Sequence, residues 1–242
     1  MSYPTVSLHA MCGRYDSHRS TDDLSAYFDA DDDTGGAVPG RYNTAPTQPV
    51  RIVVYDPERE RRTIQAARWG LVPFWAKDPS IGSRMINARA ETVTEKPAYR
   101  SAVRSMRALV PMDGWFEWRV GESGKQPCYL VPRDAGLLTA AGLYSWWDGP
   151  DGRLLSCTII TTAAVGELRT VHQRMPLLLA GEDRAGWLAP GADAADLLSV
   201  PPSDELVAGL EIRPVGGAVG SVRNEGPHLL DPVPEPAPAT LF

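Results

Sequence analysis

The sequence predicts a single α+β domain, with a core of curved, mostly antiparallel β-sheet or barrel and helices at its periphery. Short apolar runs separated by Gly- and Pro-rich turns predominate along the 242 residues, and this spacing is typical of antiparallel strands. Segments with a helical pattern are few and brief. No internal repeat and no long linker divides the chain, so one domain is expected.

The first elements are indicated by a capping signal and two apolar runs. A helix is expected over 21–28, because Ser20 or Thr21 can cap it and acidic residues occupy its first turn. Strands are expected over 51–55 and 62–69, and a Pro-Glu turn separates them.

The rest of the chain continues this pattern up to a Pro-rich end. Further strands are expected over 106–111, 114–119, 128–132, 137–143, 154–162 and 210–215. Further helices are expected over 95–102, 163–172, 183–188 and 192–198. Residues 231–242 are expected to form a disordered tail. The predicted domain therefore spans 11–230, and 1–10 is an extension outside the mature domain if Cys12 is its N-terminal residue.

Composition predicts an ordinary globular protein, with 43% hydrophobic and 22% charged residues. The apolar runs are far shorter than the roughly 20 residues that a membrane-spanning helix needs. The first ten residues have neither the positive region nor the apolar core of a signal peptide. A cytoplasmic monomer without a membrane partner is therefore expected.

The three cysteines and four histidines indicate neither a disulfide framework nor a structural metal site. Cys12, Cys128 and Cys157 form no CxxC pair, and the histidines are scattered, so no metal and no cofactor is expected. Cys128 and Cys157 lie in apolar runs and are expected to be buried packing residues.

Charge does not decide whether the partner is a nucleic acid. The net charge is −6, yet 21 of the 24 cationic residues are arginines, and six of the 30 acidic residues lie in 29–33 and from 231 on. An acidic protein can still present a local arginine-lined groove, because charges beyond a Debye length of about 8 Å are largely screened.

Cys12, in the run MCGRY, is the first candidate for chemistry. If Met11 is the initiator and is removed, Cys12 carries a free α-amine with a pKa of about 8 next to a thiol with a pKa of about 8.5. Such an aminothiol condenses with an aldehyde to an imine, and the thiol then closes a thiazolidine ring. The alternative is a buried cysteine in an N-terminal strand.

Three further segments carry residue types suited to catalysis. Asn87 and Arg89 are two apart and would share one face of a strand, offering an amide and a guanidinium for phosphate. Glu117 lies between two aromatics, where a carboxyl tends to have a raised pKa suited to proton transfer. His172 is placed to act as a general acid. Each also has a structural reading: a turn arginine, an exposed strand glutamate and a structural histidine.

Taken together, these segments resemble one family, the SRAP (SOS-response-associated peptidase) proteins. Ordered blocks over about residues 11 to 228 carry the resemblance: MCGRY, RYNTAPTQPV, ARWGLVPFWAKD, MINARAETVTEKPAYR, RALVPMDGWFEW, KQPCYL, AGLYSWW, TIITTAA, HQRMPLLL and SVRNEGP. The resemblance implies a DNA-repair protein that binds abasic sites in single-stranded DNA and shields them by a thiazolidine crosslink. It also implies peptidase action on the protein's own N-terminus, with an abasic-site lyase side activity.

The resemblance also implies roles for individual residues. Cys12 matches the crosslinking cysteine, and Asn87, Glu117 and His172 match the other catalytic residues. The positions that match DNA-binding residues are Arg14 and Arg89 for phosphates, with Trp69, Trp118 and Arg174 lining the groove. A nucleoid-associated location when bound to DNA follows. Because ten residues precede Met11, the crosslink requires that Cys12 be exposed by a later start or by cleavage.

Two other classes of function stay open at this stage. A cysteine hydrolase acting on peptides through Cys12, His172 and Glu117 would work with an internal cysteine and would not react with DNA. A non-catalytic reader of modified bases would bind duplex DNA reversibly and would survive Cys12→Ala.

Overall fold

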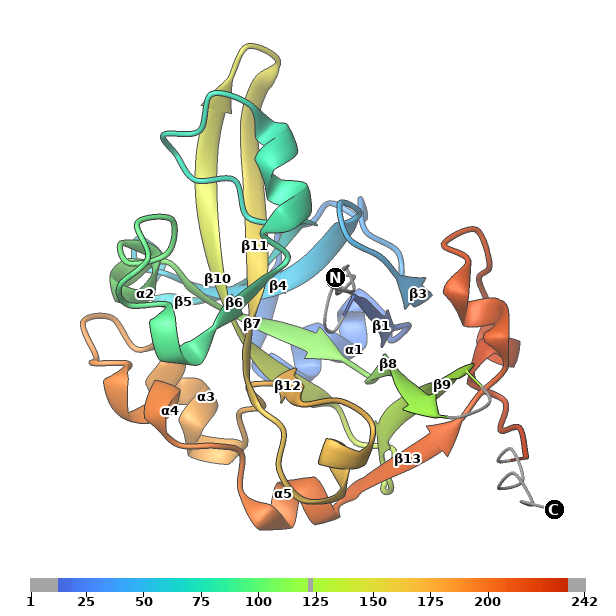
Figure 1. Ribbon diagram of the computed structural model, residues 1–242. Helices are drawn as coiled ribbons and strands as arrows, with labels where there is room; N and C mark the ends of the chain where they lie inside the picture. The colour runs from blue at the N-terminus through green and yellow to red at the C-terminus, as the bar shows by residue number, and fades with distance from the viewer. Residues whose placement is uncertain (1–12, 122–123, 235–242) are drawn as a thin grey trace, which may run out of the picture.

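The structure is a computed structural model that describes residues 13–121 and 124–234. Two β-sheets form its centre, and short helices lie around them (Figure 1). The expected α+β class with a curved, largely antiparallel core is confirmed. No helix in the described ranges is long and apolar enough to cross a membrane.

The larger sheet closes into a barrel. Its strands run in the order β12-β11-β10-β7-β4-β5-β2, with β6 paired to β11. Because β11 also pairs with β5, the five strands β11, β10, β7, β4 and β5 form a closed ring. The strand bounds are β2 Ala30–Asp32, β4 Pro49–Asp56, β5 Arg61–Trp69, β6 Asn87–Arg89, β7 Arg107–Met112, β10 Leu138–Gly149, β11 Gly152–Ala163 and β12 Arg174–Pro176.

The smaller sheet has five strands in the order β13-β9-β8-β1-β3. Their bounds are β1 Arg14–Ser17, β3 Arg41–Thr44, β8 Gly114–Gly121, β9 Gly124–Pro132 and β13 Leu210–Pro214. The inner faces of the two sheets share one apolar cluster, in which Tyr15 packs edge-on against Trp69 with ring centroids 5.1 Å apart. Cys128 and Cys157 are fully buried in this cluster, as the sequence predicts.

The helices are short and peripheral. Their bounds are α1 Thr21–Phe28, α2 Ala102–Ser105, α3 Gly181–Leu188, α4 Ala195–Ser199 and α5 Asp204–Ala208, with 3-10 turns η1 Pro79–Arg84, η2 Ala90–Thr92, η3 Gly166–Thr170, η4 Gly217–Gly220 and η5 Pro227–Leu230. The helix expected over 21–28 is confirmed, and Ser20 caps it: its hydroxyl accepts from the Asp23 amide at 3.1 Å.

Two expected helices are wrong over most of their length. Residues 95–101 form irregular turns instead of a helix, because Pro97 has no amide hydrogen to donate to the preceding turn. In 163–172 only η3 is helical, and Gly166, at φ +55°, opens that turn. Residues 231–234, expected to be disordered, are held in place, since the amide of Val233 donates to the carbonyl of Pro214 at 2.9 Å. Residues 235–242 of the expected tail lie outside the described residues.

A buried charged network ties β1 to its neighbours in the smaller sheet. The Asp16 carboxylate, wholly inaccessible, accepts from the Tyr129 hydroxyl at 2.7 Å and from His18 Nδ1 at 2.9 Å. Asp113, at the start of β8, accepts from Arg19 Nε at 2.6 Å and lies 3.4 Å from His18 Nδ1. Burial raises the pKa of Asp16, and the hydrogen bond to Asp16 raises the pKa of His18.

Candidate active site

A cavity of about 470 Å³ opens where β1, β8 and the segment after η3 meet. Gly13, the first described residue, lines it together with Arg14 of β1. The other lining residues are Pro46, Glu117, Trp118, Val120, Lys125 and His172. Four residues singled out from the sequence, Arg14, Glu117, Trp118 and His172, therefore lie around one hollow. The strands that bring them together lie at the centre of the molecule (Figure 1).

Glu117 supplies a buried acid to this cavity. Only 4% of the residue is exposed, so the structure removes the alternative of an exposed strand-face glutamate. Its position follows from the register of the smaller sheet, in which Arg14 of β1 pairs with Phe116 of β8. Phe116 is buried in an apolar cluster with Tyr129, and Glu117, the next residue along β8, lines the cavity. A carboxyl group so placed can accept or release a proton within the hollow.

His172 is held by the backbone two residues further along the chain. His172 Nδ1 lies 3.0 Å from the amide nitrogen of Arg174 and 3.2 Å from its carbonyl oxygen, so this residue fixes the ring in either tautomer. Neither contact involves Nε2, the other ring nitrogen. The amide of His172 itself donates to the carbonyl of Leu168 at 3.1 Å, which fixes the chain where η3 ends.

Arg14 places a partly buried guanidinium at the wall of the cavity. Its Nη2 donates to the carbonyl of Gly220 at 3.3 Å, whereas Nε and Nη1 are buried and have no partner within the described ranges. Burial lowers the pKa of Arg14. Guanidinium donors without acceptors favour the binding of an anionic group such as a phosphate or carboxylate.

The sequence segments that carry these cavity residues match a known family. The family model for SOS response associated peptidase (SRAP) matches residues 11–222, and it includes every lining residue of the cavity. The chain belongs to the SRAP family.

Relatives of this SRAP protein have been described in several organisms. It is 38% identical over 224 residues to the abasic site processing protein YoaM of Bacillus subtilis, an alignment that covers 91% of this chain and 98% of the relative. The abasic site processing protein HMCES of Xenopus tropicalis is 30% identical over 204 residues, 72% of this chain and 59% of that protein. A crystal structure of a protein from Bacteroides thetaiotaomicron shares the fold, with a TM-score of 0.80 at 24% identity, covering 92% of this chain and 100% of that one.

Asn87 and Arg89 lie beside the cavity rather than among its lining residues. They begin and end β6, which runs parallel to β11, with Asn87 opposite Ile159 and Arg89 opposite Thr161. Asn87 is partly buried, and its carbonyl accepts from the hydroxyl of Tyr99 at 3.4 Å. Arg89 is exposed. The two therefore share one face of a strand, as the sequence predicts.

Arg174, on β12 across β11 from β6, is bound by an acidic residue that sequence reasoning did not single out. Glu91 accepts from both Nη1 and Nη2 of Arg174, the latter at 2.9 Å, and the carbonyl of Thr161 accepts from Nη2 at 2.6 Å. The hydrogen bond to Arg174 lowers the pKa of Glu91. Glu91 stands two residues after Arg89 in the same motif, which was the available signal.

Trp69 does not line a groove, contrary to the expectation from the sequence. Its side chain is wholly inaccessible, and its indole Nε1 donates to the carbonyl of Ile86 at 3.0 Å. It is a core residue of the barrel, because the last residues of β5 alternate inward at Ala67 and Trp69. Trp118, by contrast, is partly buried and lines the cavity.

The catalytic cysteine expected from the sequence, Cys12, lies outside the described residues. Its neighbour Gly13 lines the cavity. Sequence reasoning missed three lining residues, Pro46 in the block RYNTAPTQPV, Val120 just after the block RALVPMDGWFEW, and Lys125 in the block KQPCYL.

One group among the described residues has the donor types of a metal site, Asp16, His18 and Asp113. Its atoms are already partnered. Tyr129 and His18 donate to Asp16, and the guanidinium of Arg19 donates to Asp113 at 2.6 Å. A cation would have to displace a positively charged arginine, so this network fits an ion-pair cluster and not a metal centre.

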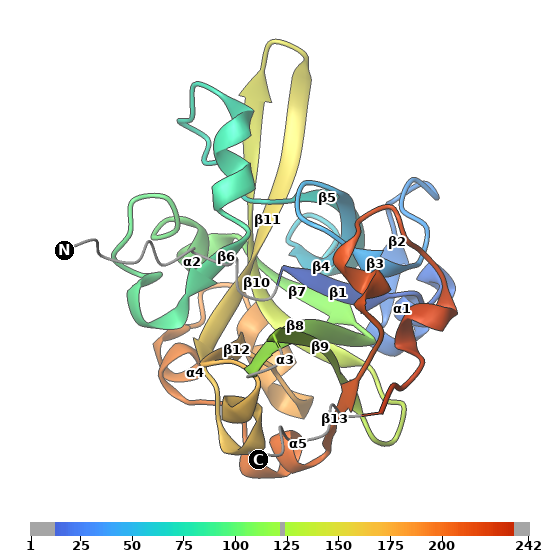
Figure 2. The ribbon, with the colours of Figure 1, turned by 45° about the vertical axis from the view of Figure 1, so that its right-hand side comes forward.

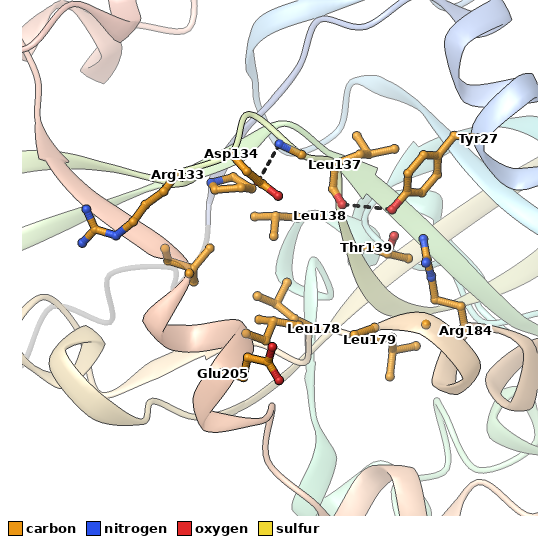
Figure 3. Close-up of a pocket in the computed structure, with 17 residues that line it drawn as sticks. Tyr27, Arg133, Asp134, Leu137, Leu138, Thr139, Leu178, Leu179, Arg184 and Glu205 are labelled. Carbon is orange, nitrogen blue, oxygen red and sulfur yellow. Dashed lines mark hydrogen bonds between the residues drawn. The ribbon is translucent and has the colours of Figure 1, made fainter.

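A second, larger cavity of about 550 Å³ is lined by residues of α3 and α5 and by the end of β9 (Figure 3). Leucines such as Leu138 and Leu178 form its floor. At its rim the guanidinium of Arg184 lies 5.0 Å from the ring centroid of Tyr27. No cysteine or histidine lines it. The smaller cavity, with its acid, histidine and arginine, is therefore the candidate active site.

Proposed function

We propose that this protein binds abasic sites in single-stranded DNA and forms a covalent crosslink to them through Cys12. The observation that carries the proposal is the single cavity next to Gly13, which combines a buried carboxyl, a histidine and an arginine with unpaired donors. Membership of the SRAP family and the names of relatives such as YoaM point to the same substrate.

The chemistry begins with the sugar. An abasic deoxyribose is mostly a closed hemiacetal, so its aldehyde must be released by moving a proton onto the ring oxygen. His172 would supply this proton, because it lines the cavity and Arg174 fixes its ring through Nδ1. Arg14 and Arg89 would hold the flanking phosphates by charge-assisted hydrogen bonds.

Bond formation then needs only the two nucleophiles of Cys12. Glu117 takes a proton from the Cys12 ammonium, and the amine adds to C1′ and expels water to give an imine. The thiolate adds to the same carbon and closes the thiazolidine ring, so the balanced products are the crosslink and one water. Asn87 would orient the sugar. If sulfur does not trap the imine, β-elimination at the 3′ phosphate gives a lyase activity.

The mechanism requires a free α-amine at Cys12, because the amide nitrogen of an internal residue forms no imine. We infer that the residues before Cys12 are absent from the active protein, through initiation at Met11 or through cleavage, including cleavage by the protein itself. The intact mass of crosslink-competent protein should therefore show Cys12 as its first residue. Finding residues 1–11 still attached to such protein would refute the mechanism.

The test is denaturing gel electrophoresis of the protein with abasic single-stranded DNA. Cys12→Ala should abolish the denaturation-resistant adduct, and Cys12→Ser should leave only a slow, hydrolysable imine. Glu117→Gln and His172→Gln should slow adduct formation by about 10²–10⁴, as is usual for acid–base groups. Matched controls are Glu205→Gln and His228→Gln, since both residues are exposed and neither lines the cavity.

The same experiment separates the other classes of function. A peptide hydrolase would form no DNA adduct and would cleave peptides with residues 1–11 in place. A non-covalent reader would retain DNA affinity but show no band shift under denaturing conditions. Adducts formed at wild-type rates by both Glu117→Gln and His172→Gln would show that these residues are structural.

A further inference from the structure

We propose that the larger cavity, between α3, α5 and the end of β9, is a second binding site that takes a small carboxylate with an apolar body. Its volume of about 550 Å³ lies within the range of about 300–1,000 Å³ that is usual for small-molecule sites. In both ribbon views α3 and α5 lie at the opposite end of the molecule from the tip of the β10–β11 hairpin (Figures 1 and 2). The cavity shares no lining residue with the candidate active site, so the inference does not depend on the crosslinking chemistry.

Thr139, near the start of β10, brings to this cavity a hydroxyl that has no partner. Only 2% of the residue is exposed, and its Oγ1 forms no hydrogen bond within the described ranges. The backbone at this point is fixed, because the carbonyl of Thr139 accepts from the amide of Leu179 at 2.8 Å. A buried hydroxyl without a partner destabilises a folded protein. A polar group bound in the cavity that Thr139 lines would supply the missing hydrogen bond.

Arg184 of α3 supplies a positive charge to the same cavity. The residue is partly buried, and it forms no hydrogen bond or ion pair with the residues that the structure describes. Its guanidinium lies 5.0 Å from the ring centroid of Tyr27, a cation–π contact that restrains it. The Tyr27 hydroxyl donates to the carbonyl of Leu137 at 3.4 Å. A guanidinium whose donors are free binds a carboxylate through charge-assisted hydrogen bonds.

The polar and the apolar parts of the lining are separate. In Figure 3 the Tyr27 hydroxyl, Thr139 and the Arg184 guanidinium lie at one end of the cavity, although they come from α1, β10 and α3. The apolar part includes Leu138, Leu178, Leu179, Leu206 and Leu210. A ligand with a carboxylate at one end and an apolar body at the other satisfies both parts, because the leucines gain from covering apolar surface.

The distribution of charge favours an anion at the polar end. Asp134 and Glu205 are the acidic residues of the lining, and Figure 3 shows both on the side away from Arg184. Asp134 Oδ1 already accepts from the amide of Gly136 at 2.9 Å. Arg133, the other arginine of the lining, points away from the cavity in the same view. Arg184 is therefore the cation that a carboxylate among these residues would meet.

The start of α3 adds to this preference. Its N-cap Ala180 and its first residue Gly181 both line the cavity, and no side chain caps the amides of this turn. Amides at the start of a helix favour an anion. Glu182 and Asp183 in the same turn offset part of that effect. The helix start thus supplements the site, which depends on Arg184 and Thr139.

The test is a titration of the full chain with hexanoate, followed through the backbone amide signals by NMR. The amides of Thr139, Ala180 and Gly181 should shift and saturate. Each methylene added between butyrate and hexanoate should raise the affinity by about 4-fold, as expected for burial of a methylene. Hexanol, which has the same apolar chain and no charge, should bind more weakly. Shifts confined to Arg14 and Trp118, at the other cavity, would overturn the proposal.

Variants at the polar end test the two groups that define the site. Arg184→Gln should weaken hexanoate binding by at least about 10-fold, the lower limit for hydrogen bonds to a charged group. Thr139→Val should weaken it by about 2- to 13-fold, as for an ordinary hydrogen bond. The matched controls, Arg133→Gln and Thr158→Val, should leave the affinity unchanged. Arg133 points away from the cavity, and Thr158 has a buried, unpartnered hydroxyl but does not line it. Wild-type affinity in both Arg184→Gln and Thr139→Val would overturn the proposal.

Thr139→Val also tests the argument in the absence of any ligand. Valine has nearly the shape of threonine and needs no hydrogen-bond partner, so the Tm of the free variant should equal or exceed that of the wild type. A lower Tm would show that the hydroxyl is already satisfied in the free protein, and the reasoning from Thr139 would fail.

The same chemical groups occur on a free organic acid and on the apolar C-terminal residue of a peptide. Tighter binding of hexanoate than of N-acetyl-leucyl-leucine would assign the site to a free acid, and the reverse order would assign it to a peptide end. If neither probe gives saturable shifts at the cavity, the proposal is refuted. Arg184→Gln should form the DNA adduct at the wild-type rate, so failure of the crosslinking proposal and failure of this one are separate results.

Discussion

Removing one hydroxyl, in Tyr129→Phe, tests whether the buried charged network holds β1 against β8 and β9. The Tyr129 hydroxyl donates to Asp16 Oδ2 at 2.7 Å, and both residues are almost fully buried. Hydrogen bonds to ionised groups contribute about 1.5–3 kcal/mol, so the free energy of unfolding should fall by that amount. For a chain of this length, a loss of 1 kcal/mol lowers Tm by about 2–4 °C, which gives a decrease of roughly 3–12 °C.

Urea unfolding followed by tryptophan fluorescence, together with thermal unfolding, measures this change. Tyr99→Phe is the matched control, because it deletes another buried hydroxyl that donates only to a backbone carbonyl at 3.4 Å. The control should lose no more than about 1 kcal/mol. A free energy of unfolding for Tyr129→Phe within about 0.5 kcal/mol of the wild-type value would mean that the hydrogen bond to Asp16 adds nothing to the stability of the sheet.

Three further predictions concern pH, DNA binding and backbone packing. The pKa of His18 is raised, chiefly by its hydrogen bond to Asp16, so its stabilising effect is complete below about pH 6.5, the value in the unfolded chain, and is lost as pH rises through the folded pKa. The stability difference between wild type and His18→Gln should therefore shrink from acid to alkaline pH, and a constant difference in urea midpoints would contradict this. Arg14→Ala or Arg89→Ala, in the Cys12→Ala background, should weaken binding of abasic single-stranded DNA and flatten the salt slope measured by anisotropy by about 0.7; slopes unchanged by both substitutions would assign these arginines to the fold. Gly70→Ala should destabilise the protein by more than about 1 kcal/mol in urea unfolding, because Gly70 has φ +125° and the new Cβ would meet the Gly82 carbonyl; a wild-type midpoint would show that the backbone can move apart there.

Apolar runs bounded by turn residues were sufficient to predict most strands of this fold. The runs 51–55 and 62–69 lie within β4 and β5. The run in β4 is continuous because both faces are buried, with Ile52 and Val54 in one apolar cluster and Val53 in another. Barrel closure could not be predicted in this way. It depends on the pairing of Ser156 and Cys157 with Arg68 and Trp69, contacts between segments far apart in sequence that no local pattern encodes.

The candidate site was predictable where a motif fixed the residue type and not where burial decided the role. Glu117 and His172 were found from their motifs, and the structure places both at one cavity. Trp69 was assigned to a DNA groove. The local sequence pattern of an aromatic residue at the end of a strand is the same whether its side chain faces the core or the solvent. The salt bridge between Arg174 and Glu91 was also missed, because it joins residues 83 positions apart.

The hydrogen bond from Arg14 to the Gly220 carbonyl joins residues 206 positions apart and has a consequence for synthesis. At about 5–20 residues per second, roughly 10–40 s pass between the emergence of the two ends of this contact from the ribosome. Arg14 is thus translated well before the carbonyl that it binds. A nascent chain carries Arg14 for all of that interval without this contact, and a chain that stops before residue 217 never acquires η4.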